Sequence, residues 1–361
     1  MSNYIEYGDK VVFHPGYYIK EMVEESGLSQ EDFAKRLGTT PKTLSKLVNG
    51  LQSLSIEIAS KLSRMLGTTL DFWLNIQKAY DIGRAEYESA QELKQEREIF
   101  KLMDYGYFVE NFGLPQMPRQ VDAQIKAVRE FLMVSSLTIL AQPDLQASFR
   151  SCSSELSKAN IVNANAMVQV AINQMAKIES PKFNRQKFVR AVEFALTKTC
   201  DHETFLPEIK AAFMEAGVIL FTLPNLKGSG INGATKKVGS RLLLLVNDRR
   251  HYADTFWFTL FHEIGHILHG DYGITFADNN DDVEDEADKY ARETLIPQTA
   301  YADFVAAHGQ NYDEQAIRDF AASIGRDPGI VYGRLQIDGR IPYIETRLAG
   351  KLRRKYDLKA G

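Results

Sequence analysis

The stretch Phe258-Thr-Leu-Phe-His-Glu-Ile-Gly-His-Ile-Leu-His269-Gly270 contains the pattern His-Glu-x-x-His within a strongly apolar run. Such a run is typical of a buried helix, and Gly270 is suited to end it in the left-handed conformation. In a helix, His262 and His266 lie four residues apart on one face, where two imidazole nitrogens can reach a single ion. We therefore predict a helix over about 254–269 that binds Zn²⁺.

Glu263 lies between the two histidines and is the candidate catalytic residue. A zinc ion lowers the pKa of a bound water and polarises the scissile carbonyl, and the glutamate can accept the proton of that water. The alternative is a helix that carries these three residues by coincidence. The apolar flanks, the glycine at the helix end and a suitable third ligand downstream all favour the metal site.

Catalytic zinc usually has three protein ligands and one open position. A third histidine in the continuation His-x-x-Gly-x-x-His is excluded, because His269 and Tyr272 occupy the required glycine and histidine positions. The other class takes a glutamate from a second helix, here predicted over 284–291 and followed by Leu295-Ile296-Pro297. We prefer Glu286, because a Glu-Ala pair facing the histidine helix is the usual setting, and keep Glu284 as the alternative. Asp288 is a candidate for orienting a histidine.

The sequence around this helix predicts a small sheet. Residues 218–221 and 241–246 are short apolar runs rich in branched side chains, which favours strands. A glycine-rich segment between them, with Gly228, Gly230 and Gly233, is interpreted as a loop. Residues 160–176 carry almost no charge and are predicted to form a buried helix.

Together, the zinc motif, the segment Glu284-x-Glu-Ala-Asp-x-Tyr-Ala-x-x-x-Leu-Ile-Pro297 and the preceding strands resemble the ImmA/IrrE family of metallo-endopeptidases. The resemblance covers about residues 205–345. It implies intracellular cleavage of a specific protein, often a transcriptional repressor.

Near the N-terminus, a pair of short helices is predicted by its capping residues. Ser29 precedes an acidic first turn, Gly38 ends that helix, and Thr40-Pro41 opens the next. This is a helix-turn-helix, whose second helix enters the major groove of DNA. The candidate DNA-binding residues are Gln30, Thr40, Lys42, Thr43, Ser45 and Lys46.

This segment resembles the Xre superfamily, and more closely HigA-type antitoxins, over about residues 10–82. The resemblance implies binding of a palindromic double-stranded DNA operator by a homodimer. A helical protein-interaction domain that has lost DNA binding is the alternative.

Bulk properties set the remaining expectations. The chain has 361 residues, a net charge of −4 and 44% hydrophobic residues, which is typical of a soluble protein with two or three domains. We find no apolar stretch long enough to cross a membrane and no secretory signal, and the two cysteines are far apart. A reduced, cytoplasmic protein with no membrane partner is expected.

We predict a mainly α fold with a small β-sheet. An all-α helix-turn-helix domain is expected over residues 1–82, a helical linker or coupling region over 83–204, and an α+β zincin-like domain over 205–361. The proposed sequence-level function is a DNA-binding transcriptional regulator whose zinc endopeptidase cleaves a specific regulatory protein or itself. The alternative is an antitoxin or repressor of a toxin–antitoxin system, whose peptidase-like domain binds a cognate toxin or senses a signal without proteolysis.

Overall fold

The structure is a computed structural model of the chain, and it describes all residues except 1–2, 143–155, 248–250, 277–281, 310 and 357–361. The chain divides into two compact units, Met1–Gln95 and Glu96–Gly361. Helices predominate and the sheets are small, so the predicted fold class is confirmed. Within the described part of the chain, no helix has the length and apolar character needed to cross a membrane.

Helices of the first unit begin and end where its sequence supplies caps. The side chains of Ser29, Thr40 and Ser55 each accept a hydrogen bond from the backbone N–H three residues on, and Gly38 and Gly67 adopt left-handed conformations after helices. These are the residues that capping rules favour. The helices are α1 (Pro15–Glu25), α2 (Gln30–Leu37), α3 (Pro41–Val48), α4 (Ile56–Leu66) and α5 (Leu70–Phe100), the last of which contains the boundary between the units.

The core of the first unit is formed where these short helices cross. Phe33 and Leu37 of α2, Leu44 and Leu47 of α3, and Trp73 of α5 are all buried in one cluster. Their spacing of three or four residues along each helix places them on one face. The helix-turn-helix geometry expected from the sequence therefore rests on a continuous apolar core.

A two-stranded hairpin precedes these helices and was not predicted. Strands β1 (Tyr4–Tyr7) and β2 (Lys10–Phe13) pair in antiparallel fashion, with Gly8 at a φ of 58° in the turn. The hairpin lies close to α5, since a methyl group added at Gly83 would be 2.6 Å from Val12 Cγ2. The first unit is therefore not all-α.

In the second unit, helices surround a four-stranded sheet. Those that precede the sheet are α6 (Tyr105–Phe112), α7 (Val121–Leu132), the 3-10 helix η1 (Leu137–Ala141), α8 (Lys158–Met175), α9 (Arg185–Thr197) and α10 (Phe205–Glu215). Helix α11 (Ala253–His269) follows the first three strands of this sheet in chain order. The helices after it are α12 (Asp282–Leu295), α13 (Gln298–His308), α14 (Glu314–Ser323), α15 (Pro328–Ile337) and α16 (Thr346–Leu352).

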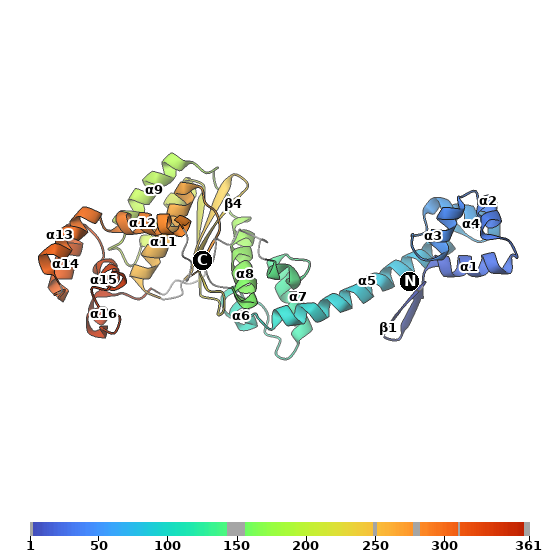
Figure 1. The fold of residues 1–361 in the computed structure, drawn as a ribbon, viewed down its shortest axis with the longest axis horizontal. Helices are drawn as coiled ribbons and strands as arrows, with labels where there is room; N and C mark the ends of the chain where they lie inside the picture. The colour runs from blue at the N-terminus through green and yellow to red at the C-terminus, as the bar shows by residue number, and fades with distance from the viewer. Residues whose placement is uncertain (1–2, 143–155, 248–250, 277–281, 310, 357–361) are drawn as a thin grey trace. The chain divides into compact units, whose positions relative to one another are not determined.

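The sheet has the order β3-β5-β4-β6, with β3 parallel to β5 and the other neighbours antiparallel. Its strands are β3 (Val218–Leu223), β4 (Ile231–Val238), β5 (Arg241–Asn247) and β6 (Ile274–Phe276). In the view of Figure 1, α8 lies on one side of the sheet, and α11 and α12 lie on the other. Both faces of β5 are buried, which explains its unbroken apolar run.

One detail of the sequence-based organisation differs from the structure. Residues 231–238, interpreted as part of a loop, form strand β4. Residues 96–204 belong to the same compact unit as residues 205–361, because α8 packs on the sheet and α9 packs on α10. The predicted boundaries at 82/83 and 204/205 stay predictions. The buried helix predicted over 160–176 is confirmed as α8.

Candidate metal centre and nucleic-acid interface

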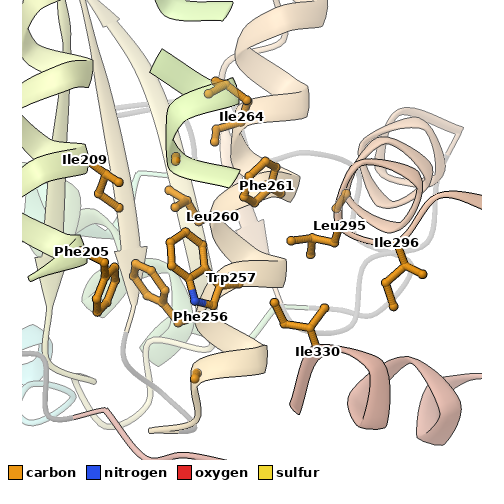
Figure 2. Close-up of a cluster of buried hydrophobic side chains, with 14 of the residues drawn as sticks. Phe205, Ile209, Phe256, Trp257, Leu260, Phe261, Ile264, Leu295, Ile296 and Ile330 are labelled. Atoms are coloured by element: carbon orange, nitrogen blue, oxygen red, sulfur yellow. The ribbon is translucent and has the colours of Figure 1, made fainter. Parts of the chain in front are cut away.

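Helix α11 carries the zinc motif in the position that the sequence predicted. It runs from Ala253 to His269 and ends at Gly270, whose φ is 85°. Its apolar side chains, among them Trp257, Leu260 and Phe261, join the main core of the second unit together with Phe205 and Ile209 of α10 (Figure 2). Burial on this side fixes the rotation of the helix about its axis and so directs His262 and His266 towards α12.

Three donor atoms converge between α11 and α12. His262 Nε2 lies 3.0 Å from His266 Nε2 and 3.0 Å from a carboxylate oxygen of Glu284. The second oxygen of Glu284 lies 3.6 Å from His266 Nε2. All three residues are buried, and their donor atoms lie within 4.8 Å of one another. Two imidazole nitrogens and one carboxylate oxygen form a common catalytic zinc set, so the residues present fit this ion.

The structure does not bring Glu286, the preferred third ligand, to the two histidines, and it places Glu284, the alternative, beside them. Glu286 is exposed, whereas Glu284 is 4% exposed and contacts both histidines. The reason is helical phase. Glu284 shares one face of α12 with the buried residues Ala287 and Ala291, and Glu286 lies about 200° around the helix from Glu284. The spacing of these alanines was the signal that favoured Glu284.

Small residues allow the two helices to approach closely. Gly265 of α11 faces Ala287 of α12, and a methyl group added at Gly265 would lie 3.3 Å from Ala287 Cα. A larger side chain at either position would push the helices apart. The distance between the histidine pair and Glu284 therefore depends on this glycine–alanine contact.

Asp288, the candidate for orienting a histidine, contacts His262. Its Oδ1 lies 2.8 Å from His262 Nδ1, and its Oδ2 accepts a hydrogen bond of 2.9 Å from Arg292. A carboxylate on one ring nitrogen fixes the tautomer and leaves the other nitrogen available as a ligand. Asp288 is one turn beyond Glu284 on the same face of α12.

The electrostatics of the cluster are those of an ion pair when no metal is bound. Burial lowers the pKa of His262, but hydrogen bonds to Asp288 and Glu284 and the charge of Glu263 outweigh it and raise the pKa to about 9. Burial raises the pKa of Glu284, but hydrogen bonds from His262 and His266 outweigh it and lower the pKa to about 2. The donor cluster thus holds the Glu284 carboxylate in its charged form, which a cation can bind.

Glu263, the candidate base, is fully buried beside the ligands. Its carboxylate lies against Gly233 of β4, where an added methyl group would be 2.6 Å from Glu263 Oε1. The glycine in the strand therefore serves a close approach, which is a recognised use of glycine in a sheet. The contact between Gly233 and Glu263 was not predicted from the sequence, because the segment that contains Gly233 was interpreted as a loop. His269 is exposed and does not belong to the donor cluster.

The candidate DNA-binding residues lie on α2, on α3 and in the turn between these helices. Gln30, Thr40, Lys42 and Lys46 are exposed, and Thr43 and Ser45 are half-buried. Thr40 caps α3, since its Oγ1 accepts from Thr43 N at 3.1 Å. Exposure at the start and along one side of α3 is compatible with entry into a major groove, and the individual contacts stay predictions.

Comparisons with known proteins agree with this division. A helix-turn-helix family model matches residues 19–73, and a model described as an IrrE N-terminal-like domain matches residues 219–325. An uncharacterized HTH-type transcriptional regulator of Escherichia coli, YddM, is 38% identical over 72 residues, which cover 20% of this chain and 77% of that protein. Antitoxin HigA-1 of Vibrio cholerae is 35% identical over 80 residues, 22% of this chain and 75% of that protein.

One of the similar solved structures is that of an addiction module antidote protein of the HigA family from Coxiella burnetii. It is 32% identical and covers 23% of this chain and 91% of its own, with a TM-score of 0.22. A putative antidote protein of a plasmid maintenance system from Nostoc punctiforme is 30% identical and covers 23% of this chain and 92% of its own, with a TM-score of 0.23.

Proposed function

Because the chain belongs to the Xre-type helix-turn-helix family and carries an IrrE N-terminal-like domain, we propose that it is a DNA-binding regulator with a zinc-dependent endopeptidase site. The observation that carries the peptidase part is the convergence of His262, His266 and Glu284, with Glu263 buried beside them. The proposed substrate is a specific regulatory protein or the chain itself, and the proposed location is the cytoplasm.

In this proposal His262, His266 and Glu284 hold the zinc, and Asp288 keeps His262 in the tautomer that presents Nε2 to it. When bound, zinc supplies Lewis acidity towards a peptide carbonyl and acidifies a water. Glu263 holds the proton removed from the attacking water on its carboxylate and delivers it to the leaving amine. Because the Glu263 side chain is buried against β4, bulk water is excluded from the carboxylate that holds this proton.

The N-terminal unit supports a role at DNA. Its relatives are named transcriptional regulators and antitoxins. The second helix of its helix-turn-helix, α3, carries the exposed lysines Lys42 and Lys46. We propose that α3 enters the major groove of an operator and that two copies bind as a homodimer. Cleavage would then act on a protein that regulates the same operator.

A second candidate function follows from the likeness to antitoxin HigA-1. In it, the chain is an antitoxin or repressor whose second unit binds a cognate toxin or senses a signal without proteolysis. The presence of Glu263 beside the donor cluster favours the peptidase, since binding alone has no use for a buried proton acceptor.

The test compares cells that carry the wild-type chain with cells that carry Glu263→Gln, which keeps the size of the side chain and removes its basicity. New protein termini should form with the wild type at rates about 10²–10⁴-fold above those of the variant, which is the usual range for loss of a general base. Purified wild type should contain about one zinc per chain. Identical termini from both proteins would support the antitoxin candidate instead.

A further inference from the structure

A pocket of about 350 Å³ lies in the second unit beside the metal centre, between the first half of α11, the end of α12 and α15. Its apolar wall includes Phe258, Leu295, Ile296, Ile330 and Ile337. Figure 2 shows Leu295, Ile296 and Ile330 together on the side of α11 away from Phe205 and Ile209. The volume is near the lower end of the range for small-ligand sites, about 300–1,000 Å³.

Two contacts connect this pocket to the metal centre. Phe258 is one helical turn before His262, and their ring centroids are 6.3 Å apart. On the facing helix, Arg292 lines the pocket and donates to Asp288, which in turn is bonded to His262. The pocket therefore begins about one helical turn from the donor cluster, along the line where α11 and α12 pack together.

The charged groups of the pocket wall already have partners. Asp254 forms an ion pair of 2.8 Å with Arg353, and Arg334 forms one of 2.8 Å with Asp338. An occupant therefore has no charge to neutralise. The apolar wall instead favours an uncharged, apolar group, and the exposed Ile337 at the pocket continues that surface outwards.

Arg292 adds no free charge to the wall. Its Nη2 donates to Asp288, and its Nε is buried, so an occupant does not reach it. The pocket is therefore suited to an apolar group, and a large apolar side chain of a peptide has that chemistry.

We propose that this pocket is the side-chain subsite of the peptidase, and that it takes a large apolar residue (Leu, Met or Phe) of the substrate next to the bond that is cut. The inference rests on the proposed function and specifies its substrate class: segments with a large apolar residue at a fixed position beside the cleaved bond.

The test is a substitution that fills the pocket from its wall. Thr255 lies on α11 seven residues before His262 and lines the pocket without being part of the donor cluster, so Thr255→Phe reduces the volume and leaves the ligands in place. Thr197→Phe is the matched control, since Thr197 is an exposed residue of α9 outside the pocket. Zinc content and the thermal midpoint, measured for both full-length variants, verify that they fold.

The readout is the cleavage-site profile on a peptide library. The wild type and Thr197→Phe should select Leu, Met or Phe at one position beside the cut. Thr255→Phe should lower kcat/KM for those peptides by at least about tenfold and shift selection to Ala or Val, as pocket-size changes do in other enzymes. An unchanged profile in a folded, active Thr255→Phe would overturn the subsite and leave the peptidase standing.

A small probe separates the remaining outcomes. N-acetyl-phenylalaninamide should inhibit the wild type competitively and bind zinc-loaded Glu263→Gln, and it should lose affinity when Thr255→Phe is added. Activation or non-competitive inhibition by the probe would make the pocket an effector site and overturn the subsite. If the wild type cleaves no peptide or protein at all, the proposed function fails and the subsite fails with it.

Discussion

Gly233 of β4 lies against the carboxylate of Glu263 in α11, so closely that a methyl group at Gly233 would be 2.6 Å from Glu263 Oε1. The strand therefore sets the position of the candidate base from outside the helix that carries it. Since Glu263 is fully buried, it has little room to retreat from a new side chain.

Gly233→Ala should consequently impair catalysis while sparing the metal site. A displacement of the base by about 1 Å is enough to cost roughly a hundredfold in rate. We expect kcat to fall by about that factor with zinc content unchanged. Gly350→Ala is the matched control, because an added methyl group there meets nothing within 4 Å. Equal activity in the two variants would show that the base does not depend on β4.

The identity of the third ligand is tested by a pair of substitutions two residues apart. Glu284→Gln should lower zinc affinity by more than about a hundredfold, because even changes in groups that only orient ligands cost about 10–100-fold. Glu286→Gln should leave it unchanged, because Glu286 is exposed and outside the donor cluster. Competition with a chelator measures both constants. The reverse order of effects would restore the assignment made from the sequence.

Without zinc, the second unit should lose stability in mildly basic solution. The folded state raises the pKa of His262 to about 9 from 6.5, so the proton on His262 stabilises the fold below about pH 6.5. That contribution is lost as pH rises through the folded value. The folded state lowers the pKa of Glu284 to about 2, so its charged carboxylate stabilises the fold at every pH above the ordinary pKa of a glutamate. That stabilisation is lost only as the pH falls towards about 2.

The measurement is the unfolding of EDTA-treated protein between about pH 6 and about pH 10, followed by Trp257 fluorescence in a Trp73→Phe background, since these are the two tryptophans of the chain. The midpoint should fall across this interval. Asp288→Asn removes a carboxylate that raises the pKa of His262, and should flatten the fall. A midpoint that rises with pH in the metal-free wild type would contradict the expected linkage.

At the N-terminal end, Lys46→Ala should weaken operator binding and reduce the slope of log affinity against log salt by about 1 if Lys46 contacts a phosphate. Lys46 is an exposed residue in the last turn of α3. Lys94→Ala, an exposed lysine of α5, is the control of equal charge. Fluorescence anisotropy at several salt concentrations checks both variants. Equal slopes would remove Lys46 from the interface.

Much of the zinc helix was predictable because its local signals agree. The apolar run, the i, i+4 histidines and the terminal glycine all specify the same helix, and the structure has it over Ala253–His269. The caps at Ser29 and Thr40 were predictable for the same reason, since a cap involves only residues of its own turn.

The structure differs from the sequence-based expectations where contacts between segments far apart in the chain determine the local structure. Gly233 weakens the strand signal of residues 231–238 locally, and only the contact with Glu263 explains why a glycine is there. The choice between Glu284 and Glu286 depends on which face of α12 packs on α11. That face was readable from Ala287 and Ala291, but a preference based on the Glu-Ala pair alone pointed to Glu286, which the structure places outside the donor cluster.

Glu284 belongs to the first turn of α12, which begins at Asp282. The first turn is the part of a helix that frays most readily, because its amide groups lack intrahelical acceptors. A zinc ligand at this position makes metal binding and helix nucleation one equilibrium, so part of the affinity for the ion is spent on ordering the turn. Amide hydrogen exchange at the start of α12 should then slow on zinc addition, and the chain would register zinc availability as well as use the ion.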